Sequence, residues 1–166
     1  VPRAVLLQWQ SELYETFNLS VPVYDGKRLT WKATHANPIG RDRVVARDEW
    51  HREPFVLASS QPTSPRDRAN HPLRADAWDL VVLDEAHHAR RRAPGSPQEG
   101  GPNQLLRLLE EIRPKARSLL LLTATPLQVH PVELWDLLRL LGLPSTWAAN
   151  SSLFIKYFEL ARGNPG

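Results

Sequence analysis

The spacing of apolar residues along the chain predicts which segments are helices and which are strands. Residues 3–17 repeat their apolar positions at helical spacing, which predicts an amphipathic helix that buries Trp9. A short strand over 21–24 follows this helix. The pattern over 27–53 is polar, rich in arginine and weak, and it indicates no more than a possible helix near 41–52.

Three further segments are mainly apolar and predict strands. Residues 55–60 predict a buried strand. Residues 79–83 and 118–122 are continuous apolar runs without alternation, which is typical of strands that are covered on both faces in a parallel sheet. Between these two runs, residues 91–102 are rich in proline and glycine and show no periodicity, which indicates a mobile surface loop.

Helical periodicity returns in the second half of the chain. Asn103 is a suitable N-cap for a helix whose apolar stripe ends at Ile112. A further helix over 131–141 has proline near its start and acidic residues in its first turns, as the helix dipole favours. The tail predicts one more helix, with apolar positions at Phe154, Tyr157, Phe158 and Leu160.

This succession of strands and helices predicts an α/β fold with a parallel sheet, in which ligands bind at the carboxyl ends of the strands. The 166 residues are enough for one substantial core, and neither a repeat nor a second domain is evident. No apolar run approaches the ~20 residues of a membrane span. The absence of cysteine excludes disulfides and thiolate metal sites.

The net charge is +3, and most of the basic residues are arginines in local clusters. Arginine suits bidentate contacts with phosphate, so the composition admits a nucleic-acid partner. Solvated surface is the commoner interpretation of any one cluster. The clusters are Arg41, Arg43, Arg47 and Arg52, then Arg66, Arg68 and Arg74, and finally Arg90 to Arg92.

Two carboxylates stand directly after the apolar run 79–83. Asp84 and Glu85 would therefore lie at the ligand-binding edge of the predicted sheet. Mg²⁺ takes one or two carboxylates together with phosphate oxygens and keeps most of its water, so Asp84 could hold a magnesium ion. Glu85 could orient or deprotonate an attacking water, and phosphoryl transfer needs this division of labour.

A second polar segment, Thr-Ala-Thr-Pro at 123–126, follows the run 118–122. The hydroxyl groups of Thr123 and Thr125 could reach His87 if the two strands are neighbours in the sheet. Such a contact would couple the carboxylates to a distant edge of the domain. The alternative is a threonine-rich strand exit without a role in chemistry.

Two other interpretations of the acidic pair remain. One is a strand end that merely caps the following helix. The other is a metallohydrolase that uses Asp84, His87 and His88 as ligands. We expect the two adjacent histidines to point apart, which argues against this metal site.

Three segments, in order, resemble successive motifs of the first motor domain of Swi/Snf-type ATPases, the DNA-translocating branch of helicase superfamily two. They are VPRAVLLQWQSEL at 1–13, WDLVVLDEAHHAR at 78–90 and LLLLTATPLQ at 119–128. VLASSQ at 56–61 resembles the motif between the first two, and residues 84–87 spell the DEAH motif of the superfamily. The resemblance covers nearly the whole chain, and this version looks bacterial.

The resemblance implies a RecA-like α/β fold of three layers, with a parallel sheet flanked by helices, and a DNA-dependent ATPase that uses ATP and Mg²⁺. Asp84 would contribute to Mg-ATP coordination and Glu85 would activate water. His87 would relay to Thr123, Thr125 and Gln128. DNA, duplex rather than single-stranded, is the implied partner, and the residues that match DNA-contacting motifs are Pro2, Arg3, Ser59, Ser60, Gln61 and Thr125.

Some family features differ or are absent. The usual Thr-Gly-Thr is Thr123-Ala124-Thr125, and an asparagine often found after Gln128 is Val129. The phosphate-binding sequence G-x-x-x-x-G-K-[ST] does not occur, and no methionine stands at position 1. We therefore expect residues 1–166 to be an incomplete N-terminal RecA-like domain that lacks its P-loop strand.

The remainder of the same polypeptide would supply the P-loop segment and a second RecA-like domain. Alone, this chain would hydrolyse no measurable ATP. The alternative is a non-catalytic nucleic-acid- or protein-binding module that keeps the fold. The expected location is the cytoplasm, associated with the nucleoid and not with a membrane.

Overall fold

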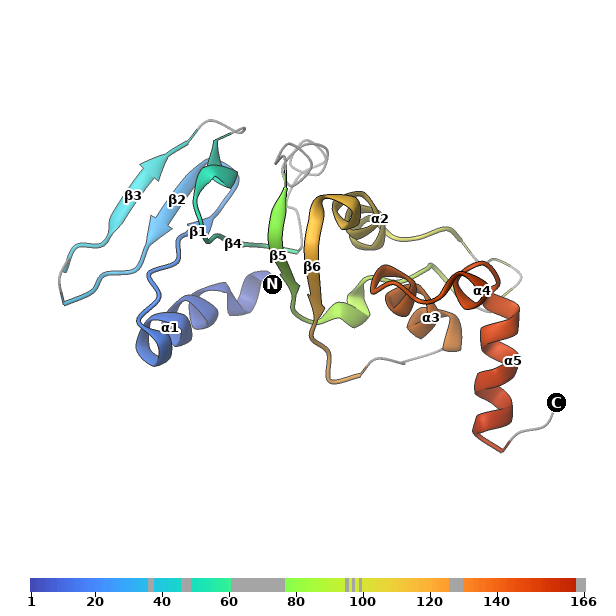
Figure 1. Cartoon of the computed structure of the whole chain (residues 1–166). Helices are drawn as coiled ribbons and strands as arrows, with labels where there is room; N and C mark the ends of the chain where they lie inside the picture. The colour runs from blue at the N-terminus through green and yellow to red at the C-terminus, as the bar shows by residue number, and fades with distance from the viewer. Residues whose placement is uncertain are drawn as a thin grey trace. The chain divides into compact units, whose positions relative to one another are not determined.

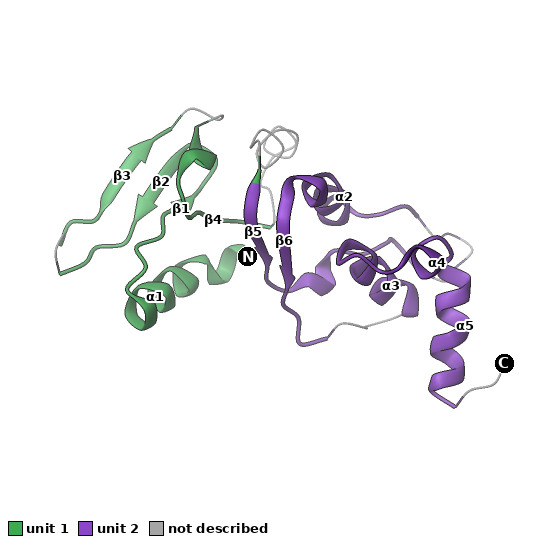
Figure 2. Cartoon of the chain, viewed as in Figure 1, with its two compact units in different colours: residues 1–77 green, residues 78–166 purple. Residues whose placement is uncertain are grey.

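The computed structural model divides the chain into two compact units, residues 1–77 and 78–166 (Figure 2). Each unit has a sheet and a hydrophobic cluster of its own. Nothing in the hydrophobic pattern indicated this division. The residues that the structure describes are 1–35, 38–45, 49–60, 77–94, 96, 98, 100–125 and 130–163.

The first unit combines an amphipathic helix with a small sheet (Figure 1). Its elements are η1 (Arg3–Val5), α1 (Leu6–Phe17), β1 (Val23–Tyr24), β2 (Arg28–Trp31), β3 (Arg41–Val44), η2 (Trp50–Arg52) and β4 (Leu57–Ala58). The strand order in this four-stranded sheet is β3-β2-β1-β4, with β1 antiparallel to β2 and parallel to β4. The strand predicted over 55–60 is thus confirmed only over its two central residues.

The first predicted helix is confirmed, although its first turn is the 3-10 helix η1. Trp9 is only half-buried, so the expectation that the helix buries it holds in part. The residue that ties α1 to the sheet is the buried Gln10, whose amide nitrogen donates to the carbonyl oxygens of Val21 (2.8 Å) and Thr30 (2.9 Å). These bonds satisfy buried polar groups on both elements.

The helix considered near 41–52 is wrong over Arg41–Val44, which form a strand, and residues 46–48 of that range lie outside the described residues. Strand β3 runs antiparallel to β2, with Arg41 opposite Trp31, and the described residues near the end of the range form the short helix η2. The guanidinium carbon of Arg41 lies 3.9 Å from the centre of the Trp31 ring. This cation–π contact across the strand pair favours the hairpin over a helix.

The second unit contains a pair of parallel strands and most of the helices (Figure 1). Its elements are β5 (Trp78–Leu83), η4 (Ala86–His88), α2 (Gln104–Ile112), η5 (Arg113–Lys115), β6 (Ala116–Leu121), α3 (Pro131–Leu140), α4 (Ser145–Ala148) and α5 (Ser151–Ala161). Strands β5 and β6 pair from Trp78 opposite Ala116 to Leu83 opposite Leu121. The strands and helices predicted for this half of the chain are confirmed.

The mixed α/β class is confirmed, but β5 and β6 are not covered on both faces. Leu80, Val82 and Leu120 are 53%, 40% and 46% exposed, whereas Leu83 and Leu121 pack into the core. The expectation of strands buried on two faces is therefore wrong for the chain as described. Leu83, Leu119 and Leu121 pack against residues of α2 and α3, and the three-layer arrangement stays a prediction.

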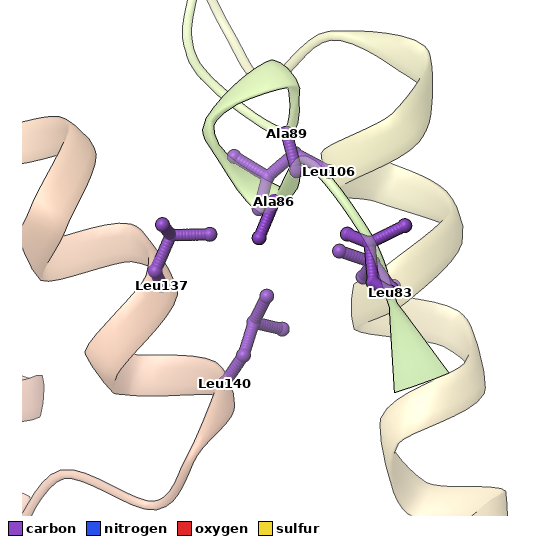
Figure 3. Packing of buried hydrophobic residues seen from close by; sticks show 7 residues of the cluster. Leu83, Ala86, Ala89, Leu106, Leu137 and Leu140 are labelled. Carbon is purple, nitrogen blue, oxygen red and sulfur yellow. The ribbon is translucent and has the colours of Figure 1, made fainter. Parts of the chain in front are cut away.

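The core of the second unit assembles around the turn that follows β5 (Figure 3). Ala86 and Ala89 are fully buried in this turn, and Leu106 of α2 approaches them from one side. Leu137 and Leu140 of α3 complete the cluster. Because alanine side chains are short, the turn lies close to both helices, and its backbone is held by packing.

The segment over 91–102 has a structured base. Arg91 and Pro102 form an isolated antiparallel bridge, and the Gly100 amide donates to the carbonyl oxygen of Arg92 (2.9 Å). The mobility of this loop stays a prediction. Among the described residues, no helix is both long enough and apolar enough to cross a bilayer.

Candidate functional site

The carboxyl ends of β5 and β6 lie side by side, as the motifs at these two ends predicted. The Leu122 amide donates to the Leu83 carbonyl oxygen, and the Ala86 amide donates to the Leu122 carbonyl oxygen, both at 2.9 Å. Backbone pairing therefore continues beyond the last paired residues of the strands. It brings the acidic pair and the threonine-bearing segment to the same edge of the sheet.

Asp84 and Glu85 form a sharp bend between β5 and η4. Glu85 has a φ of 54°, in the left-handed region, and the Asp84 carboxylate accepts a hydrogen bond from the Glu85 amide (3.0 Å). A non-glycine residue in this region costs about 1–2 kcal/mol. The bond from Ala86 to Leu122 holds the bend in place. As a result the Glu85 side chain is 41% exposed, so water can reach its carboxylate.

His87 lies between Glu85 and Thr123. Its side chain is 12% exposed, and its Nδ1 atom lies 3.2 Å from Glu85 Oε2 and 3.0 Å from Thr123 Oγ1. An imidazole nitrogen carries either one proton or one lone pair, so Nδ1 is either a hydrogen-bond donor or an acceptor. A protonated Nδ1 can donate to the Glu85 carboxylate, whereas an unprotonated Nδ1 can only accept from the Thr123 hydroxyl.

The Thr123 hydroxyl is oriented by the backbone of Thr125. The Thr125 amide donates to Thr123 Oγ1 at 3.2 Å, which leaves the Thr123 hydroxyl proton available for His87 Nδ1. The predicted contact between His87 and the threonine segment is thus present through Thr123. Thr125 enters this arrangement through its backbone. Gln128 lies outside the described residues.

A second group of predicted residues meets in the first unit. The Val1 nitrogen donates to the Ala58 carbonyl oxygen (3.1 Å), and the Ser60 amide donates to the Val1 carbonyl oxygen (2.8 Å). These bonds place the start of the chain beside the end of β4. They bring together four of the residues that match DNA-contacting motifs, Pro2, Arg3, Ser59 and Ser60. Gln61 lies outside the described residues.

Comparison with protein families identifies the chain. The model of the SNF2-related domain matches residues 1–161. The chain belongs to the SNF2-related domain family. The Swi/Snf-type resemblance drawn from the motifs is thereby confirmed, and this SNF2-related domain is a member of a family of helicase-like, ATP-dependent motors.

The orientation of His87 and His88 in this SNF2-related domain differs from the expectation. The rings of His87 and His88 lie 4.2 Å apart and are tilted by 45°, so the expectation that they point apart is wrong. Across the described residues, no group of three or more histidine or acidic side chains could hold a metal ion. Mg²⁺ does not need such a group, because one or two carboxylates with water and phosphate oxygens suffice.

Asp84 fits a magnesium ion by its chemistry. It presents hard carboxylate oxygens, which Mg²⁺ prefers. A carboxylate offers about four lone-pair positions, and one of them accepts from the Glu85 amide. The half-buried position at the end of a strand also limits the movement of the side chain.

Two supports of residues 84–91, which we call the DEAH turn, were not predicted from the sequence. Asn103 caps α2 as predicted, since its Oδ1 accepts from the Leu106 amide (2.9 Å), but its Nδ2 also donates to the His88 carbonyl oxygen (2.6 Å). Arg91 was interpreted as surface charge, yet it forms two hydrogen bonds with the buried Asp136. The close succession of three arginines was a signal of charge, but it did not identify a partner 45 residues away.

Proposed function

We propose that this SNF2-related domain contributes the magnesium-binding and water-activating carboxylates of a DNA-dependent ATPase that moves along DNA. The contact of His87 with both Glu85 and Thr123 carries the proposal. A strand end that only capped a helix would need neither an accessible carboxylate nor a histidine that also contacts Thr123 after the neighbouring strand.

Asp84 would hold the Mg²⁺ of Mg-ATP, and the ion would neutralise charge on the phosphoryl group during transfer. Glu85 would orient the attacking water and take its proton. Its exposed carboxylate beside a rigid strand end suits this role, because a general base must lie within hydrogen-bond reach of the proton that it removes.

His87 would couple this chemistry to the rest of the motor. When Nδ1 accepts from Thr123, Glu85 is released from the imidazole and can bind water. A movement at the end of β6 would therefore change the availability of the base. Thr125 and Gln128 would belong to the same coupling segment.

The segments that meet beside β4 would form part of the DNA-binding surface. Arg3 is exposed and could contact a phosphate, and hydroxyl groups such as those of Ser59 and Ser60 commonly bind phosphate oxygens. Pro2 and Gln61 belong to the same motifs and would also contribute to DNA binding. Contacts of this kind fix the register of a protein on duplex DNA without reading its sequence.

The remainder of the same polypeptide would supply the phosphate-binding loop and a second RecA-like domain. Because G-x-x-x-x-G-K-[ST] does not occur among these 166 residues, we expect no measurable ATP hydrolysis by the chain alone.

The test is Glu85→Gln in the full-length protein, with Glu111→Gln as a matched control. Glu111 is an exposed glutamate on α2. Loss of the general base should lower DNA-stimulated ATP turnover by about 10²–10⁴-fold, whereas nucleotide binding should survive and the control should behave as wild type. Undiminished turnover in Glu85→Gln would refute the role of Glu85. Absence of turnover in the wild-type protein would favour a non-catalytic binding module.

A further inference from the structure

Helix α3 carries two buried acidic residues that face the arginines at the end of the DEAH turn. Asp136 is 1% exposed and Glu133 is 4% exposed. Arg91 binds Asp136 through Nε to Oδ2 (2.8 Å) and Nη2 to Oδ1 (2.9 Å), and Arg90 Nη1 lies 3.9 Å from Glu133 Oε1. The Arg91–Asp136 pair is thus bidentate, a geometry that fixes direction as well as distance.

The pair is one of several contacts that anchor the DEAH turn. The start of the turn is held by the bond from Ala86 to Leu122, and its middle by the bond from Asn103 to the His88 carbonyl oxygen. Arg91 anchors the exit of the turn to α3, the next described helix after the threonine segment. The residues between these anchors include His87, which makes the contacts with Glu85 and Thr123.

Stability alone is a poor explanation for this pair. The Arg91 side chain is 25% exposed, but Asp136 is buried, and the desolvation of its carboxylate offsets much of the attraction. Apolar residues of similar volume are therefore often as stabilising. The junction already has apolar packing, because Ala86 and Ala89 lie against Leu137 and Leu140. Such packing is non-directional, whereas the two parallel hydrogen bonds are satisfied at only one placement of the turn on the helix.

We propose that Arg91 and Asp136 are positioning residues for ATP hydrolysis. They act through the DEAH turn: their ion pair sets the placement of η4 on α3, and this placement keeps His87 Nδ1 within reach of both Glu85 and Thr123. This inference rests on the proposed function of the same site. Because the single atom His87 Nδ1 lies 3.0 Å from Thr123 Oγ1 and 3.2 Å from Glu85 Oε2, a small displacement of the turn would break one of the two contacts.

The test uses the full-length protein and two kinds of variant. The double variant Arg91→Met/Asp136→Leu replaces the pair with apolar side chains, and Arg91→Lys keeps the charge but removes the planar fork. The control is Arg139→Gln/Glu110→Gln, which removes a solvent-accessible ion pair between α3 and α2. Each variant is measured for kcat, KM for ATP, duplex DNA affinity and thermal midpoint.

For the double variant and for Arg91→Lys, kcat should fall by about ten- to a hundredfold, because a small misplacement of catalytic groups has effects of this size. KM and DNA affinity should stay at wild-type values in both variants, and the control should be unaffected. The thermal midpoint should stay at the wild-type value in the double variant, whereas Arg91→Lys should lower it, because one oxygen of the buried Asp136 loses its donor. Arg91→Lys keeps the test decisive if the apolar pair does not fold.

A kcat within about twofold of wild type in Arg91→Lys, or a loss of kcat in the double variant that tracks a loss of its thermal midpoint, would overturn the positioning role. Glu85→Gln in the same experiment separates the two proposals. If wild type is active and Glu85→Gln is not, the proposed function stands whatever the Arg91 variants do. If wild type has no turnover, both proposals fail.

Discussion

Asn103→Ala removes two hydrogen bonds of different kinds in a single substitution. The Oδ1 atom of Asn103 accepts from the Leu106 amide and caps α2, while Nδ2 donates to the His88 carbonyl oxygen in the DEAH turn. Asn150 provides a matched control, because its side chain also caps a helix, α5, by accepting from the amides of Ser152 and Leu153.

The two bonds have separable energies. Loss of an asparagine N-cap costs about 1 kcal/mol. Loss of the bond to the His88 carbonyl should add about 0.5–1 kcal/mol, toward the lower end of the usual range, because solvent reaches this bond. Asn103→Ala should therefore cost about 1.5–2 kcal/mol, and Asn150→Ala about 1 kcal/mol. Asn103→Asp keeps the cap and loses only the donor to His88.

Urea unfolding followed by circular dichroism measures these differences. With a slope of about 1–2 kcal/mol per molar urea, Asn103→Ala should lower the unfolding midpoint by roughly 1 M. The midpoint of Asn103→Asp should fall between that of Asn103→Ala and wild type. If Asn103→Ala costs no more than Asn150→Ala, the bond to the His88 carbonyl oxygen does not stabilise the turn.

Two further predictions concern the helix–sheet contact of the first unit and the coupling contact of the second. Gln10→Ala leaves two carbonyl oxygens without their buried donor and should cost about 2–3 kcal/mol in urea unfolding, whereas Gln8→Ala, at an exposed position, should stay within about 0.5 kcal/mol of wild type. Thr123→Val keeps the shape of the side chain but removes the hydroxyl. In the full-length protein it should lower DNA-stimulated turnover while Mg-ATP binding, measured by nucleotide fluorescence, is retained, and unchanged stimulation would exclude the coupling role.

The meeting of the acidic pair and the threonine segment could be predicted because of two simple features. Both follow a continuous apolar run, and the carboxyl ends of parallel neighbours share an edge. The sequence also predicted the Asn103 cap, since caps depend on local residues. These features need only short-range patterns and one assumption about strand order, and β5 and β6 are indeed neighbours.

Features that depend on distant partners could not be predicted. The apolar run of β5 has the same composition on its inner and outer faces, so it did not show that Leu80 and Val82 are exposed. Arg41 and Arg91 belong to similar arginine-rich segments, yet one stacks on a tryptophan across a hairpin and the other binds a buried aspartate. Charge patterns identify neither partner, because both are set by the tertiary fold.

The backbone at Glu85 connects the fold to the chemistry. Gly26, Gly40 and Gly142 also have positive φ values, and glycine adopts this conformation without strain. A bend alone would therefore be served by glycine at position 85. Ala93 shows that strain by itself does not mark a site, since it has a φ of 45° in an exposed position. At Glu85, however, the strained backbone lies in an anchored turn and carries an accessible carboxylate. This carboxylate lies beside His87, which also contacts Thr123. The strain is best explained if a carboxylate is needed where the bend places it.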